Sequence, residues 1–254
     1  MSFDVAADAY DAFMGAWSRG LSAAFADFAA IERSAADRVL DVGCGTGALT
    51  AELVARVGAA RVAGVDPSGS FVAAMRTRFP DVDVREGSAE ALPHPDGAFD
   101  RVLAQLVVHF MTDPVAGIRE MARVAAPGGT VAACVWDHVG AGGPLRPFWR
   151  AARSVVADVD DESRLPGVRE GHLAALFAEA GLTEIATGAI TATRDYPSFD
   201  DWWEPFTRGV GPAGSFLRAQ PPGVADAVRA EAARSLPSGP FTLSGTAWAA
   251  RGVA

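Results

Sequence analysis

Two aspartates and a run of glycines early in the chain have the residue types and the spacing of a ligand site. Asp41 lies inside the segment VLDVGCGTG, whose glycines are Gly43, Gly45 and Gly47, and Asp66 follows 19 positions after the last glycine. Glycine loses more backbone freedom on folding than any other residue, so three of them mark a sharp turn or a close approach to a ligand. An acidic side chain about 20 residues after such a turn can accept hydrogen bonds from both hydroxyls of a ribose. The pattern therefore predicts a ligand that contains a ribose.

The spacing of the glycines and the position of Asp41 narrow the choice of ligand. Dinucleotide-binding turns have the pattern G-x-G-x-x-G, whereas this chain has G-x-G-x-G. A carboxylate at Asp41 would repel a pyrophosphate, but it suits a cationic group such as the ammonium of an amino acid. These features favour a nucleoside joined to an amino acid, as in S-adenosylmethionine, over a nicotinamide dinucleotide.

Apolar stretches typical of buried strands alternate with helical patterns along most of the chain. The predicted strands are 38–42, 61–65, 82–84, 99–104, 130–136, 183–192 and 241–251. The predicted helices are an N-terminal amphipathic segment (3–28), 49–57, 67–79, 114–124, 172–180 and a polar and aromatic stretch, 198–236. Such alternation predicts βαβ units and a mostly parallel sheet with helices on both faces.

Composition and charge argue against several classes of protein. With 254 residues, half of them hydrophobic, the chain is long enough for one large domain. Its net charge of −9 argues against a protein that binds nucleic acid or anionic membranes mainly by charge. No apolar stretch approaches the roughly 18 residues of a membrane-spanning helix, and the N-terminus lacks the pattern of a secretory signal. The two cysteines form neither a disulfide framework nor a metal-ligand cluster, so we expect a soluble, cytoplasmic protein without a bound metal.

Four motifs follow one another in the chain: VLDVGCGTG, VDPS, EGSAEALPHPDGAFDRVLAQLVVHF and EMARVAAPGGTVAACVWD. They cover about residues 38–137 and resemble the class I S-adenosylmethionine-dependent methyltransferases, in particular the ubiquinone- and menaquinone-biosynthesis-like (methyltransferase type 11) branch. The resemblance implies that the methionine end of the cofactor lies against Asp41, Gly43, Cys44 and Gly45, the ribose against Asp66 and Pro67, the adenine against Ser88, Ala89 and Glu90, and the sulfonium above Gln105. Thr46, Gly47 and Ser68 complete the expected cofactor-binding set. The family often has Asp at the position of Ser88, which leaves adenine recognition to the Ala89 backbone or to Ser88 itself.

The expected architecture is a single methyltransferase domain over residues 1–254. Its fold class is α/β, with a doubly wound, Rossmann-like, mostly parallel seven-stranded sheet, helices on both faces, an antiparallel last strand and helical lid insertions. A helical cap is expected over 1–34, the cofactor-binding core over 38–137, and acceptor-side insertions over 138–170 and 196–237.

Several residues near the predicted cofactor have more than one possible role. Trp17 and Arg19 belong to a helix that either packs on the body of the protein or covers the cofactor near its carboxylate end. The aromatic segment 196–217 either packs internally or forms the wall of an apolar acceptor pocket. His109 follows the fourth strand, and we hypothesise that it is an acceptor-side base or orienting group, the alternative being a structural histidine.

Together these features predict S-adenosylmethionine-dependent methyl transfer to an oxygen, nitrogen or carbon atom of a small, partly hydrophobic metabolite. From Gln105 the chain reads QLVV in place of the Asn/Asp-Pro-Pro-Tyr motif of DNA amino-methyltransferases, so nucleic acid is not expected as the substrate. One alternative is a non-catalytic regulator that binds S-adenosylmethionine or S-adenosylhomocysteine. The other is an NAD(P)-dependent oxidoreductase with the same topology. The identity of the acceptor and the oligomeric state stay open.

Overall fold

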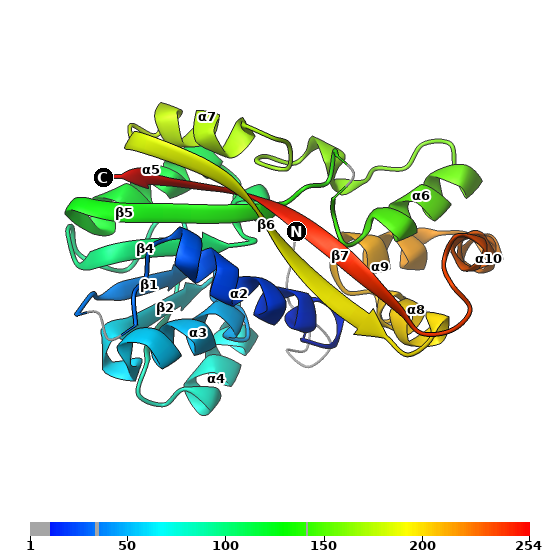
Figure 1. The fold of residues 1–254 in the computed structure, drawn as a ribbon, viewed down its shortest axis with the longest axis horizontal. Coiled ribbons are helices and arrows are strands. Elements are labelled where there is room, and N and C mark those ends of the chain that lie inside the picture. Colours follow the sequence, from blue (N-terminus) through cyan, green and yellow to red (C-terminus); the bar gives the residue numbers. More distant parts are fainter. Residues whose placement is uncertain (1–10, 34–35, 141) are drawn as a thin grey trace.

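A computed structural model describes residues 11–33, 36–140 and 142–254, and its centre is a seven-stranded sheet (Figure 1). The strand order is β3-β2-β1-β4-β5-β7-β6. The mutually parallel strands are β1 (Val39–Val42), β2 (Val62–Asp66), β3 (Asp83–Glu86), β4 (Phe99–Gln105) and β5 (Ala125–Trp136). The last strand, β7 (Phe241–Val253), runs antiparallel to both β5 and β6 (Thr183–Tyr196). The predicted fold class, including the antiparallel last strand, is confirmed.

The strand order reverses at β1, which places the carboxyl ends of β1, β2 and β4 side by side. From β1 the chain builds outward to β2 and β3, and then returns to add β4 and β5 on the other side of β1. The sequences VLDV and VAGVD form β1 and β2, two buried parallel strands, because most of their side chains are apolar, and every residue in them is buried. In doubly wound sheets a ligand binds outside the carboxyl ends of the strands at such a reversal.

Helices cover both faces of this sheet. One face carries α2 (Ala16–Phe28), α3 (Ala48–Val57) and α4 (Gly69–Arg78), and the other carries α5 (Pro114–Val124) and α7 (His172–Glu179). Short turns of helix are η1 (Asp11–Gly15), η2 (Ala59–Arg61) and η3 (Val108–Phe110). The predicted apolar stripe of the N-terminal segment is buried from Phe13 to Phe25, and the part before Asp11 lies outside the described residues.

Several element boundaries differ from the sequence prediction, and the differences have local causes. The helix predicted from Pro67 begins at Gly69, because the backbone of Ser68 is extended and its N–H is bonded to Asp66. The fifth strand begins at Ala125 instead of Thr130. Its first part contains the Pro-Gly-Gly sequence, and its pairing with β4 is irregular there. The sixth strand continues to Tyr196, because β7 pairs with it along its length.

The segments 138–170 and 198–236 form a second group of helices, near the end of the β6–β7 pair that is farther from α7 (Figure 1). The segment 138–170, predicted as a loop or short helical insertion, contains α6 (Arg146–Val155) and η4 (Glu162–Arg164). The single helical stretch predicted over 198–236 is three helices: α8 (Phe199–Thr207), α9 (Gly211–Ala219) and α10 (Val224–Ser235). Aromatic side chains join them, as in the stacked pair Phe148 and Phe206, whose ring centroids are 4.6 Å apart.

None of the helices in the described parts of the chain combines the length and the apolar character needed to cross a bilayer.

Candidate functional site

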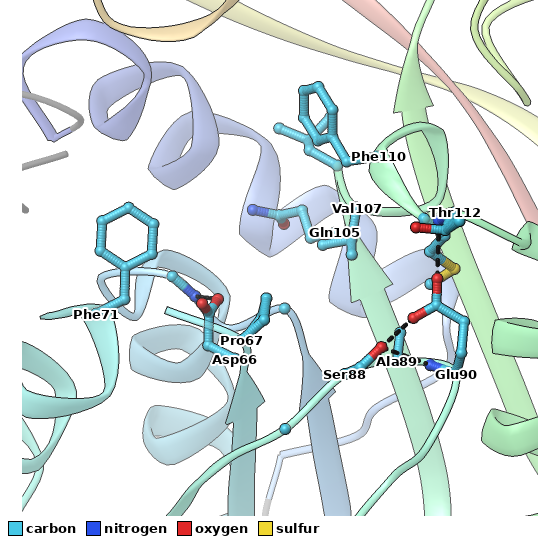
Figure 2. Close-up of a pocket in the computed structure, with 15 residues that line it drawn as sticks. Asp66, Pro67, Phe71, Ser88, Ala89, Glu90, Gln105, Val107, Phe110 and Thr112 are labelled. Carbon is cyan, nitrogen blue, oxygen red and sulfur yellow. Dashed lines mark hydrogen bonds between the residues drawn. The ribbon is translucent and has the colours of Figure 1, made fainter. Parts of the chain in front are cut away.

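A cavity of about 270 Å³ opens at the carboxyl ends of β1, β2 and β4, where the strand order reverses (Figure 2). Its walls come from the glycine turn, the end of β2, the loop after β3 and the segment after β4. The lining residues are Gly43, Gly45, Asp66, Pro67, Phe71, Gly87, Ser88, Ala89, Glu90, Gln105, Leu106, Val107, Phe110, Met111 and Thr112. The fold thus brings together residues from motifs that lie up to about 70 positions apart in the chain. We name this space the cofactor cavity.

Asp66 ends β2, and two backbone N–H groups hold its carboxylate. The N–H of Gly45 donates to Oδ2 at 2.8 Å and the N–H of Ser68 donates to Oδ1 at 2.9 Å. Burial raises the pKa of Asp66, and these two hydrogen bonds oppose the shift. Each carboxylate oxygen has a further lone pair, and the side chain borders the cofactor cavity (Figure 2). The carboxylate can therefore accept two more hydrogen bonds, which is the number that two ribose hydroxyls donate.

The glycines of the turn are required for different reasons. Gly43 has a φ of +68°, and a Cβ atom there would lie 2.4 Å from Cγ2 of Val107. Gly45 has a φ of +52°, and within the described structure an added Cβ would meet no atom within 4 Å apart from its chain neighbours. Because Gly45 also lines the cofactor cavity, a side chain at this position would occupy ligand space. Packing requires the first glycine, whereas the second leaves room for a ligand.

Asp41 lies in β1 and faces a second cavity of about 30 Å³ beside the first. Its side chain is buried, and Oδ2 accepts a hydrogen bond from Oγ1 of Thr50 at 2.6 Å. Burial raises the pKa of Asp41 from 3.8 to about 7, opposed by the bond from Thr50 and reinforced by the nearby charge of Asp66. A cationic group in the small cavity would stabilise the ionised carboxylate. The lining residues of this cavity are Gly15, Ser18, Asp41, Gly43, Cys44, Gly45, Thr46, Ala48, Leu49 and Gln105.

Gln105 ends β4 and lines both cavities. Its Nε2 donates to the carbonyl of Ser18 and to Oγ of Ser22, each at 3.1 Å, so the orientation of the amide is fixed. Its Oε1 is buried and has no hydrogen-bond partner among the described residues. The next residue, Leu106, has a φ of +63°, which is rare for a side chain of this size. An unsatisfied acceptor and a strained backbone therefore meet where the reactive end of the predicted cofactor is expected.

The loop after β3 borders the cofactor cavity through Ser88, Ala89 and Glu90. The hydroxyl of Ser88 donates to the carboxylate of Glu90, which also accepts the N–H of Thr112 at 2.8 Å (Figure 2). The Ser88 hydrogen is thus engaged within the loop. Of the two alternatives for adenine recognition, this arrangement favours the backbone of Ala89.

An apolar cavity of about 30 Å³ adjoins the cofactor cavity, and Leu106 and Phe110 line both. The remaining lining residues are Phe13, Met14, His109, Trp136, His138, Leu145, Glu162, Gly211 and Pro212. His109 is buried in η3, and its ring packs on Phe110 with centroids 3.8 Å apart. Burial, with a contribution from His138, lowers the pKa of His109 well below 6.5. His109 therefore borders this space as a neutral imidazole.

Some predicted site residues lie outside the linings of these three cavities. Trp17 is in the core, where its Nε1 donates to the hydroxyl of Tyr196 at 3.1 Å. Arg19 forms an ion pair with Asp11 at 2.8 Å, beside Gly15. Ser68 contributes through its backbone bond to Asp66. Gly47 begins α3, where an added Cβ would lie 2.4 Å from Sδ of Met75. The aromatic side chains Trp202, Trp203 and Phe206 pack within the helical group.

Other lining residues were not predicted from the sequence. They are Phe71, Gly87, Leu106, Val107, Phe110, Met111 and Thr112 in the walls of the cofactor cavity. Most of them directly follow the carboxyl end of β3 or β4. The rule that ligands bind outside strand ends would have included these loops if it had been applied to whole segments instead of motif residues.

A doubly wound sheet with a glycine turn, two buried acids and a cavity at the strand reversal defines a Rossmann-like protein with a nucleoside site. Residues 40–133 match the family model described as "Methyltransferase domain". The resemblance predicted from the motifs is confirmed over these residues, which make up less than half of the chain.

Curated relatives and solved structures agree with this match. The chain is 33% identical over 157 residues to a probable S-adenosylmethionine-dependent methyltransferase of Mycolicibacterium smegmatis, covering 60% of each protein. It is 42% identical over 105 residues to a demethylmenaquinone methyltransferase of Mycolicibacterium gilvum, covering 41% of this chain and 44% of that protein. The matched stretches thus span less than two thirds of the length of these relatives.

The fold extends beyond the matched stretch. A Haemonchus contortus phosphoethanolamine N-methyltransferase 2 in complex with S-adenosyl-L-methionine superposes with a TM-score of 0.58 at 18% identity, covering 97% of this chain and 56% of that chain. At this identity the likeness concerns the fold alone.

Proposed function

We propose that this protein binds S-adenosylmethionine in the cofactor cavity and transfers its methyl group to a small, partly hydrophobic metabolite. The observation that carries the proposal is the carboxylate of Asp66, which is held by two backbone N–H groups and still has two acceptor positions at the cavity. With the ribose at Asp66, the adenine lies by Ala89 and the amino-acid end reaches the small cavity at Asp41. The family match over residues 40–133 supports the same cofactor.

The methyl group would lie near Gln105, at the boundary between the cofactor cavity and the apolar cavity. Methyl transfer needs the acceptor atom and the methyl carbon to be close and in line, and a protein supplies this mainly by positioning. The apolar cavity shares Leu106 and Phe110 with the cofactor cavity, so it is a suitable side for the acceptor. At about 30 Å³ it is small, and an organic acceptor must displace part of its wall, to which η1 and α9 contribute. We therefore propose the segments 138–170 and 196–237 as the acceptor side of a single domain.

His109 is proposed to orient the acceptor. Its lowered pKa means that the protonated imidazolium is disfavoured in this buried position. The residue is therefore poorly suited to accept and hold the proton of the acceptor. A neutral imidazole can still donate or accept a hydrogen bond. Of the two roles predicted from the sequence, orientation of the acceptor fits this environment better than general base catalysis.

Three further parts of the proposal concern the substrate class and the location, and they rest on charge, on the cysteines and on the cavity lining. The net charge of −9 argues against nucleic acid as the substrate. The two cysteines, Cys44 and Cys134, are buried free thiols, which suits a cytoplasmic location. The apolar lining of the acceptor side favours a metabolite with some hydrophobic surface.

Transfer of labelled methyl groups tests the proposal. The protein, freed of endogenous ligand, is incubated with methyl-labelled S-adenosylmethionine and small-molecule extract, and labelled products are separated from the cofactor. We expect a labelled small molecule with the wild-type protein and its loss in Asp66→Asn. Binding of the cofactor without any labelled product would favour the non-catalytic regulator. Labelling of nucleic acid in a parallel reaction, with total nucleic acid in place of the extract, would contradict the proposed substrate class.

A further inference from the structure

Three ligand-type side chains from distant parts of the sequence meet on the wall of the apolar cavity. His109 lies in η3 after β4, His138 lies in the loop after β5, and Glu162 begins η4. One ring nitrogen of each histidine and one carboxylate oxygen lie within 4.8 Å of one another. Nε2 of His138 is 3.7 Å from Oε1 of Glu162, and the two imidazole centroids are 6.0 Å apart. We name these residues the His-His-Glu cluster.

The polar atoms of this cluster are buried without direct hydrogen bonds between them. Nδ1 of His109 and Nε2 of His138 are inaccessible and have no hydrogen-bond partner among the described residues. At 3.7 Å, the separation between His138 and Glu162 exceeds the range of a hydrogen bond. Leaving a buried polar group unsatisfied costs about 1–3 kcal/mol, so atoms of this kind facing one another indicate an occupant between them.

Neighbouring groups hold the cluster in place. Nε1 of Trp149 donates to Oε2 of Glu162 at 2.9 Å, which leaves the other carboxylate oxygen, Oε1, toward His138. The loop that carries His138 is closed by Asp137, whose carboxylate accepts the N–H groups of Gly140 at 2.6 Å and Gly142 at 3.2 Å. Hydrogen bonds that fix ligands from behind are typical of metal sites in proteins.

We propose that His109, His138 and Glu162 bind one divalent transition-metal ion, with an open coordination position toward the apolar cavity. Two imidazole nitrogens and one carboxylate oxygen are ligands that suit Zn²⁺ and related first-row ions. Bonds of about 2.0–2.2 Å place two ligand atoms on one ion roughly 3–3.5 Å apart. The separation between His138 and Glu162, 3.7 Å, is already close to this range, and the other ligand atoms, all within 4.8 Å, must move closer together. The adjoining space of about 30 Å³ has room for a water molecule beside the ion.

The site goes beyond the sequence prediction, which included no bound metal. It also adds a mode of substrate recognition, and this part rests on the proposed function. An oxygen or nitrogen atom of the acceptor would replace the water on the ion. His109 would then orient the acceptor through the metal. Binding of the ion itself depends only on the three side chains and requires neither cofactor nor acceptor.

Titration of the full-length, chelator-treated protein with Zn²⁺ in the absence of S-adenosylmethionine tests the site directly. We expect one Zn²⁺ per chain by calorimetry and by elemental analysis after gel filtration. Substitution with Co²⁺ should give the visible absorption of an ion with nitrogen and oxygen ligands. His138→Ala and Glu162→Gln should each weaken binding at least about tenfold.

His94→Ala is the matched control, because His94 is also a buried histidine whose Nε2 has no partner in the described chain, but it lies outside the cluster and packs on Phe99. Its affinity for Zn²⁺ should equal that of the wild type. Absence of stoichiometric Zn²⁺ from the folded wild-type protein would overturn the proposal, as would a crystal structure at saturating Zn²⁺ with only water between the three side chains. Equal losses in His94→Ala and Glu162→Gln would also overturn it. Because S-adenosylmethionine binding is measured separately, failure of the metal site and failure of the proposed function are distinguishable.

Discussion

The glycine turn and the His-His-Glu cluster line two adjoining cavities that share Leu106 and Phe110, and they are built in different ways. At the turn, residues 41–68 supply two aspartates and the backbone groups that hold one of them, all within one strand–helix–strand unit and the two residues after it. At the cluster, the three side chains come from separate segments that follow β4, follow β5 and begin η4. One nitrogen of each histidine has no hydrogen-bond partner among the described residues. The first arrangement can be read from a continuous motif, whereas the second exists only after the chain has folded.

This contrast also separates two ways of making a binding site. The cofactor side uses backbone N–H groups and glycines at strand ends, which are independent of most side-chain identities. The proposed acceptor side depends on aromatic packing among α6, α8 and α9, where the particular side chains set the shape. The family model matches residues 40–133 and stops before the segments proposed as the acceptor side. Different sites built on one fold are how that fold can serve many functions.

Removal of Phe148 should test whether the two sides are energetically separate. This side chain is fully buried and packs on Trp149, Phe206 and Phe216. Phe148→Ala should lower the free energy of unfolding by about 3–5 kcal/mol, because it leaves a cavity in the aromatic group. Urea denaturation measures this loss, and calorimetry should show S-adenosylmethionine affinity within about twofold of the wild type. Phe71→Ala alters the cofactor cavity itself and serves as the reference variant for lost cofactor affinity. An equally large loss of affinity in Phe148→Ala would contradict the energetic separation of the two sides.

Asp66→Asn should have the largest effect on cofactor binding. The amide keeps the shape of the side chain but loses its charge and one of its two acceptor oxygens. We expect affinity for S-adenosylmethionine to fall by about 2–4 kcal/mol, or roughly 30- to 1000-fold. Asp137→Asn is the matched control, because Asp137 is also buried and also accepts two backbone N–H groups, but it lies outside the cofactor cavity. Similar losses in both variants would show that burial, and not ribose recognition, explains the effect.

Alanine at the first two glycines should separate folding from binding. Gly43→Ala combines a left-handed backbone with a contact to Val107, so we expect a loss of about 2–3 kcal/mol in the free energy of unfolding. Gly45→Ala has the same backbone strain without the contact and should lose about 1–2 kcal/mol. Its added methyl group enters ligand space, so affinity for the cofactor should fall more than stability does. A Gly45→Ala protein with unchanged affinity would place the ligand elsewhere.

Asp41→Asn should change how stability depends on pH. The pKa of Asp41 is raised from 3.8 to about 7, so between these values the folded chain keeps a proton that the unfolded chain releases. The free energy of unfolding of the wild type therefore falls as pH rises through this window, whereas Asn does not titrate. Relative to the wild type, the variant should gain about 2 kcal/mol between about pH 5.5 and pH 8. Denaturation curves at both pH values measure the change, and an equal difference at both would contradict the raised pKa.

The sequence predicted the fold and most of the cofactor side because the relevant signals are local. VLDV and VAGVD are short, mostly apolar runs, and Asp66 is the last residue of the second, at the end of a strand. Boundaries were less accurate where pairing with another strand decides the length, as in β6, which β7 extends to Tyr196. Trp17 shows the same limit: helical spacing left open whether it packs on the body or covers the cofactor, and only the fold reveals Tyr196 as its partner.

The acceptor side could not be predicted in the same way, because its residues are distant in the chain. His109, His138 and Glu162 are separated by more than 20 residues each, with no spacing typical of a metal motif. The position of Ser88 was predicted, but its bond to Glu90 was not, since neighbouring polar side chains can pair in several ways. Pairing of this kind depends on the loop conformation, which the sequence pattern leaves undetermined.

Calorimetric titration with S-adenosylmethionine, and separately with NAD and NADP, tests the central claim most directly. The wild-type protein must first be stripped of any ligand that accompanies it through purification. We predict binding of S-adenosylmethionine alone, with one site per chain. Binding of NAD or NADP in its place, or of none of the three to folded protein, would contradict the assignment of the cavity at Asp66.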